Sequence, residues 1–95
     1  MSAYVIVDIN VADPAGYEEY KRLAAPTVTA YGGKYIALGG RTETFEGTWR
    51  PTRLVILEFE SLERARQWLH SPEYEGPRRL RQETATTNMI VVEGV

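Results

Sequence analysis

Alternating apolar and polar positions predict a β-strand over residues 4–11. One face of it is β-branched (Val5, Val7, Ile9, Val11), and the other is mixed (Tyr4, Ile6, Asp8, Asn10). Three further segments rich in β-branched and aromatic residues predict strands over 34–38, 53–59 and 88–95. Gly39 and Gly40 are expected to form a bulge, after which the second strand resumes over 41–46 and residues 47–52 form a loop.

Helix-start signals follow the first and third predicted strands. Asp13 and Pro14 start a helix over 14–31, because Asp accepts from free amides of the first turn and Pro has no amide to leave unpaired. Pro26 is expected to kink or break this helix near Ala24 and Ala25. Its apolar residues recur at steps of three and four: Tyr17, Tyr20, Ala24, Val28, Tyr31.

The second half of the chain repeats this order of elements. Ser61 caps a helix that reaches residue 70, and Ser71 starts a further helical segment that Gly76 and Pro77 interrupt. Residues 5–9 and 55–59 align position by position. We therefore predict an α+β fold of βαββαβ order, a four-stranded antiparallel sheet with two helices on one face. Its first and third strands are expected to be central neighbours, parallel to each other because the crossovers are right-handed.

Both faces of the predicted central strands carry large apolar side chains. Tyr4, Ile6, Leu54 and Ile56 lie opposite Val5, Val7, Val55 and Leu57. Helices cover only one of the two faces, and an uncovered apolar face invites a partner. We therefore expect a homodimer in which two sheets pack face to face.

Composition fits a single domain over residues 1–95, with 43% hydrophobic and 25% charged residues. The absence of cysteine excludes a disulfide scaffold and a cysteine nucleophile. The net charge of −2 provides no basic field, so no nucleic-acid partner is expected. The apolar runs are too short for a membrane span, and the first residues lack the basic region of a signal peptide. We expect a cytoplasmic protein without a membrane partner.

Several stretches of the chain resemble a known family. They are Asp13-Pro14 with Tyr17 and Tyr20, then Gly32-Gly33-Lys34-Tyr35, Glu46-Gly47-Thr48-Trp49-Arg50-Pro51-Thr52-Arg53 and Ser71-Pro72-Glu73-Tyr74. Together they resemble the domain-of-unknown-function family 1330, within the dimeric α+β barrel superfamily. The resemblance implies a ferredoxin-like dimer. It implies no particular reaction, because the superfamily includes cofactor-free monooxygenases, haem-degrading enzymes, lactone isomerases and proteins without known activity.

Glu46, Trp49 and Arg53 form the most distinctive cluster of polar and aromatic side chains. A guanidinium offers a bidentate fork and an indole offers a stacking face, so the cluster suits a planar acidic ligand. A structural role is the favoured alternative. In that role Glu46 pairs with an arginine across a hairpin or a dimer contact, and Trp49 covers apolar surface.

Asp8 and Glu58 occupy matching places in the two aligned strands. If these strands are parallel neighbours, the carboxylates approach on one face, and one of them keeps a proton beside a base. Catalysis would then need no cofactor, with Arg41 or Arg53 stabilising developing negative charge. The structural alternative is that these arginines simply neutralise both carboxylates.

His70 is the only histidine, so we expect no metal and no cofactor. A haem site would need Asn10, Trp68 and His70 together, but Trp68 and His70 stand two residues apart and do not share a helix face. A solvent-facing histidine at a helix end is favoured. The short basic run flanked by glutamates is expected to be a solvated helix face: Arg78, Arg79, Arg81.

Tyr17, Tyr20 and Tyr74, with Tyr31, can line a cavity between helices and sheet, although plain core is the favoured interpretation. The resemblance places ligand sites of the superfamily in that space. The leading hypothesis is a homodimer that holds a small apolar or aromatic, weakly acidic ligand there. The alternatives are a cofactor-independent monooxygenase- or isomerase-like enzyme and a non-catalytic structural or interaction protein.

Overall fold

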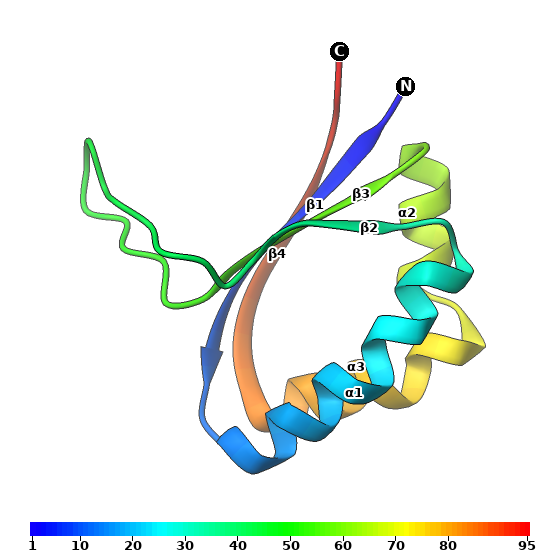
Figure 1. The fold of residues 1–95 in the computed structure, drawn as a ribbon, viewed down its shortest axis with the longest axis horizontal. Helices are drawn as coiled ribbons and strands as arrows, with labels where there is room; N and C mark the ends of the chain where they lie inside the picture. Colours follow the sequence, from blue (N-terminus) through cyan, green and yellow to red (C-terminus); the bar gives the residue numbers. More distant parts are fainter.

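One sheet with helices on one of its faces accounts for the chain, of which the computed structural model describes residues 1–95 (Figure 1). The elements follow in the order β1 (Ala3–Val11), α1 (Pro14–Ala30), β2 (Lys34–Leu38), β3 (Leu54–Phe59), α2 (Leu62–Leu69), α3 (Pro72–Thr84) and β4 (Ala85–Glu93). This confirms the predicted α+β fold of βαββαβ order. The second crossover holds two helices, α2 and α3, so three helices rather than two cover the sheet.

The strands lie in the order β2-β3-β1-β4, and every neighbouring pair is antiparallel. β1 and β3 are central neighbours as predicted, but the expectation that they are parallel is wrong. The crossover through α1 makes β1 and β2 run the same way, and β3 returns between them in the opposite direction. The register therefore pairs Tyr4 with Glu58 and Asp8 with Leu54.

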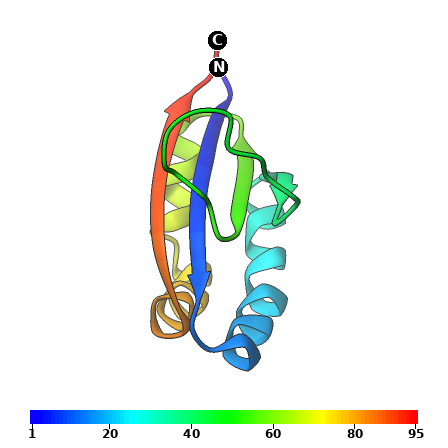
Figure 2. The ribbon, with the colours of Figure 1, turned by 90° about the vertical axis from the view of Figure 1, so that its left-hand side faces the viewer.

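Residues 39–53 form an arm without strand or helix between β2 and β3. The prediction that the second strand resumes over 41–46 is wrong, because a ribbon that projects from a sheet has nothing to pack against and is marginal in water. The arm leaves the sheet on the side opposite the helices (Figures 1 and 2). The bulge lies earlier than predicted, inside β2 between Tyr35 and Ala37.

The predicted helix caps are all present. Each cap side chain accepts a hydrogen bond from the amide three residues later: Asp13 from Gly16 at 3.2 Å, Ser61 from Arg64 at 3.0 Å, and Ser71 from Tyr74 at 3.1 Å. These bonds satisfy amides that the first helical turn leaves free. No helix combines the length and the apolar character that a bilayer crossing needs.

Two prolines lie inside helices without ending them. α1 continues through Pro26, which excludes the break of the two alternatives predicted there, a kink or a break. α3 continues through Gly76 and Pro77, so the interruption expected there is wrong. Each proline leaves one carbonyl without its helical donor, on Arg22 and on Glu73. Both of these residues are exposed, so water can replace the missing amide.

The two faces of the sheet differ in their cover. Val5, Val7 and Ile9 of β1 are buried under the helices, whereas no helix covers the outer face, which only the arm overlies in part (Figure 2). On that outer face Ile90 is 62% exposed and Val92 is 47% exposed. The sheet therefore presents an apolar surface on the side from which the arm projects.

Trp68 connects three elements within the core. Its ring lies 5.3 Å from that of Phe59 in β3 and 4.2 Å from that of Tyr74 in α3, measured between centroids. Its indole Nε1 donates to Thr27 Oγ1 of α1 at 3.0 Å. Only 2% of Trp68 is exposed, so this single side chain fixes the spacing between sheet and helices.

Replacing Trp68 with alanine is expected to lower the free energy of unfolding by about 3–5 kcal/mol, because a large buried ring is lost and a cavity is left. Urea titration followed by circular dichroism measures this change. The matched control is Trp49→Ala, since Trp49 is 60% exposed and should cost far less. Equal losses in the two variants would contradict this account of the core.

Candidate functional site

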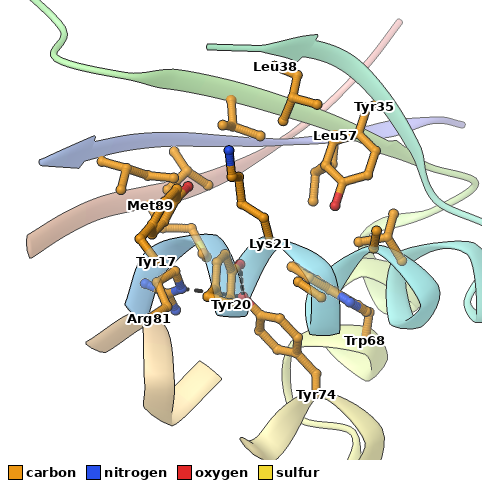
Figure 3. Close-up of a pocket in the computed structure, with 16 residues that line it drawn as sticks. Tyr17, Tyr20, Lys21, Tyr35, Leu38, Leu57, Trp68, Tyr74, Arg81 and Met89 are labelled. Carbon is orange, nitrogen blue, oxygen red and sulfur yellow. Dashed lines mark hydrogen bonds between the residues drawn. The ribbon is translucent and has the colours of Figure 1, made fainter. Parts of the chain in front are cut away.

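A cavity of about 120 Å³ lies between the sheet and helices α1 and α3 (Figure 3). Of the 16 residues that line it, 14 are hydrophobic, and none is an aspartate or glutamate. The lining consists of Val7, Ile9, Tyr17, Tyr20, Lys21, Ala24, Ala25, Val28, Tyr35, Leu38, Val55, Leu57, Trp68, Tyr74, Arg81 and Met89. Such a concave apolar space with few polar groups is typical of small-molecule sites.

The cavity wall on α1 follows from helical spacing. Tyr17, Tyr20, Ala24 and Val28 recur at steps of three and four, so they share the face that the helix turns toward the sheet. The opposite wall comes from every second residue of β1 and of β3, because side chains two positions apart in a strand point to the same face of the sheet. Tyr17, Tyr20 and Tyr74 therefore line the cavity, and their contact with a ligand stays a prediction.

Two tyrosine hydroxyls and an arginine form the polar end of the cavity. The hydroxyls of Tyr20 and Tyr74 lie 2.7 Å apart in a buried hydrogen bond. Arg81 Nε donates to the Tyr74 hydroxyl at 3.3 Å, and Arg81 Nη1 donates to Thr87 Oγ1 at 2.6 Å. Burial, reinforced by the neighbouring Tyr74, raises the pKa of Tyr20 well above its usual value, so this phenol is neutral at physiological pH.

The rim of the cavity carries Tyr35 and Lys21. Burial raises the pKa of Tyr35, whose hydroxyl points into the cavity in Figure 3. Lys21 Nζ pairs with Glu18 at 2.6 Å on the exposed side of α1. The polar groups at the rim are thus a neutral phenol and an ammonium group.

Arg53 packs beside the cavity without lining it. Its guanidinium lies 5.6 Å from the centroid of the Tyr17 ring, and its buried Nε has no hydrogen-bond partner. Gly39 makes this position possible, because a Cβ there would collide with the guanidinium and the backbone has a φ of +69°. Arg53 therefore lies on the helix side of the sheet.

The predicted cluster of Glu46, Trp49 and Arg53 is divided by the sheet. Trp49 Nε1 donates to Asp8 at 2.9 Å on the outer face, whereas Arg53 contacts Tyr17 on the inner face. Glu46 is exposed on the arm and shares a shallow depression there with Trp49. Arg41 is also exposed and makes no ion pair. The expectation of one joint site is wrong, and separate ligand roles for these residues stay predictions.

The predicted approach of Asp8 and Glu58 is wrong as well. The antiparallel register places them four positions apart along β1, roughly 13 Å at the usual rise of a strand. Asp8 accepts from Trp49 and from the Thr52 amide at 3.0 Å, and Glu58 accepts from the Tyr4 hydroxyl at 3.3 Å. Both carboxylates lie on the face away from the cavity. A catalytic role for either stays a prediction that concerns the outer face.

Arg81 is the polar residue of the cavity that the sequence analysis missed. It was expected on a solvated helix face, yet only 4% of it is exposed. Tyr74, Pro77, Arg81 and Thr84 recur at steps of three and four and form the buried face of α3. This spacing in the sequence predicts a buried position for Arg81, provided that the helix is taken to continue through Pro77.

The remaining polar candidates take structural places. His70 is the exposed C-terminal cap of α2, as favoured. Arg79 pairs with Glu75 at 3.2 Å on the exposed face of α3. No group of three or more His, Asp or Glu side chains comes together anywhere in the chain.

Comparison with known proteins identifies a family that matches nearly the whole chain. The pattern of the family described as "Domain of unknown function (DUF1330)" matches residues 2–95. No curated protein is significantly similar to the chain.

Solved structures share its fold. A protein of unknown function from Rhodopseudomonas palustris has 17% identity and a TM-score of 0.80, with 99% of this chain and 82% of that chain covered. SnoaB from Streptomyces nogalater, described as a cofactor-independent oxygenase, has 11% identity and a TM-score of 0.69, with 99% and 93% covered. A Bacteroides fragilis protein, described as dimeric and ferredoxin-like with unknown function, has 14% identity and a TM-score of 0.64, with 98% and 96% covered. At these identities the likeness shows the fold alone.

The neutral, buried Tyr20 predicts that the free energy of unfolding falls as the pH rises above 10, the ordinary tyrosine pKa. Above that pH the unfolded chain loses the Tyr20 proton while the folded chain keeps it, so alkali favours unfolding by about 1.4 kcal/mol per pH unit for one group. Tyr20→Phe removes this contribution. Urea titrations at about pH 9 and about pH 11 should show the stability difference between wild type and variant shifting in favour of the variant. A difference that does not change with pH would refute the assignment.

Proposed function

The chain belongs to the DUF1330 family, and on this basis and that of its cavity we propose that it is a homodimeric protein holding a small apolar or aromatic, weakly acidic molecule between sheet and helices. The apolar cavity is the main support for this proposal. Of the 16 residues that line it, 14 are hydrophobic, and a few hydroxyl and cationic groups lie at one end and at the rim. Apolar walls bind a ring or short chain by excluding water, and the few polar groups set its orientation.

The size of the cavity limits the ligand. Its volume of about 120 Å³ is close to that of an apolar protein cavity of about 150 Å³ that accepts benzene. A single six-membered ring with one small polar substituent is therefore the largest group that fits without displacement of the walls.

The outer face of the sheet supports the proposed homodimer. Ile6 and Ile56 are paired across β1 and β3, and Ile90 and Val92 extend the apolar surface onto β4. This surface faces the viewer in Figure 2, behind the arm. A second copy offers the same apolar surface and buries both, which is the self-complementary arrangement of a two-fold dimer. The dimeric B. fragilis protein of the same fold adds to this support.

Catalysis without a cofactor is the second candidate function. SnoaB, of the same fold, is described as a cofactor-independent oxygenase. The hydrogen-bonded hydroxyls of Tyr20 and Tyr74 offer a hydrogen-bond donor to a reacting group inside an apolar space, where hydrogen bonds are stronger than in water. Consumption of a bound ligand in the absence of added cofactor would distinguish an enzyme from a carrier. A protein that binds nothing would favour the non-catalytic structural or interaction role.

A cavity that binds single-ring acids predicts a ligand-dependent thermal shift. At about a hundredfold excess over its dissociation constant, a ligand should stabilise the wild type by about 2.7 kcal/mol. Ala25→Trp should abolish the shift, because Ala25 lines the cavity and is open to solvent, so an indole there closes the entrance. Ala30→Trp is the matched control, exposed on the same helix and outside the lining. No shift with any ring-sized acid or neutral analogue would count against the cavity as a binding site.

The sheet-face homodimer predicts that the wild type sediments as a dimer at micromolar concentration. Ile56→Lys should shift it to monomer, since an ammonium buried between two sheets has no counter-charge. Glu63→Lys introduces the same side chain on the exposed face of α2 and should leave the dimer intact. Wild-type protein that sediments as a monomer would refute this assembly.

A further inference from the structure

Arg81 is a buried cation without an anion beside it. Only 4% of the residue is exposed, and no carboxylate lies within ion-pair distance. The three ion pairs of the chain join other residues on exposed helix faces: Lys21 with Glu18, Arg22 with Glu19, and Arg79 with Glu75. Burial of a charge costs free energy unless an opposite charge or hydrogen bonds compensate it, so a compensating partner is expected for this guanidinium.

The hydrogen bonds of Arg81 leave several of its N–H donors free. A guanidinium has five N–H donors. Arg81 uses Nε toward the Tyr74 hydroxyl and Nη1 toward Thr87 Oγ1, both neutral acceptors, and Nη2 makes no hydrogen bond. Arg81 lines the cavity, so a ligand inside reaches this residue without any rearrangement of the backbone. Its charge and part of its donor set are available to a ligand.

The other charged and titratable groups around the cavity do not neutralise Arg81. Lys21 at the rim is a second cation, and Arg53 beside Tyr17 is a third. The remaining titratable groups are tyrosines, and burial keeps Tyr20 in its neutral form. With no acidic residue in the lining, no negative charge inside the cavity offsets the positive charge of Arg81.

We infer that the ligand of this cavity carries a carboxylate that pairs with Arg81, while its ring or chain lies among the apolar side chains of α1 and the sheet. The inference rests on the proposed function and specifies the chemical class of its ligand. A carboxylate matches the charge and the planar donors of a guanidinium. The mutual hydrogen bond of the Tyr20 and Tyr74 hydroxyls uses one of their two protons, and the other proton can be donated to the second oxygen of the carboxylate. The volume of about 120 Å³ restricts the class to benzoate-sized acids.

The test compares benzoate with benzamide, which has the same ring and nearly the same shape but no charge. Isothermal titration of the wild type should give an affinity for benzoate at least about tenfold higher, as expected when a charge-assisted hydrogen bond replaces a neutral one. Arg81→Met should lower benzoate affinity to the level of benzamide and leave benzamide affinity unchanged. Arg79→Met, on the exposed face of the same helix, should bind both as the wild type does.

Stability supplies an independent readout. Exchange of an uncompensated buried charge for an apolar side chain of similar length is expected to keep or raise the melting temperature of the free protein. If Arg81→Met does not fold, the wild-type comparison of benzoate with benzamide decides alone. Equal wild-type affinities would overturn the inference and leave the proposed function standing. Failure of both ligands and of other ring-sized molecules to bind would overturn both.

Discussion

The position of the Trp68 ring is the constraint on which the rest of the structure depends. It packs against the rings of Phe59 in β3 and Tyr74 in α3 and donates a hydrogen bond to Thr27 of α1, so it sets the distance between the sheet and the helices. The cavity that Tyr20 and Tyr74 line exists because the layers are held apart by aromatic side chains of fixed shape.

Local sequence signals predicted most of the elements, and long-range pairing was the information they lacked. Asp13, Ser61 and Ser71 marked the helix starts correctly because a cap acts on amides three residues away. The relative direction of β1 and β3 depends on where β2 lies, and no local pattern encodes that. The alignment of Asp8 with Glu58 therefore suggested a carboxylate pair, although antiparallel pairing separates residues that occupy matching places in two similar strands.

The site was predictable to the extent that it follows from periodicity. Tyr17 and Tyr20 fall on the inner face of α1 by spacing alone, whereas the basic run flanked by glutamates predicts that Arg81 lies on the surface. Its burial depends on α3 passing through Pro77 without a break, which in turn depends on solvent at the Glu73 carbonyl. The distinctive residues of the arm suggested one cluster, but the sheet separates Trp49 from Arg53.

The bulge in β2 has a consequence for the colloidal behaviour of the protein. β2 is an edge strand of only five residues, and its pairing slips between Tyr35 and Ala37. A foreign strand needs a regular row of free backbone donors and acceptors to add to an edge, and the bulge interrupts that row. The bulge thus hinders growth of this sheet by addition of a foreign strand on the β2 side.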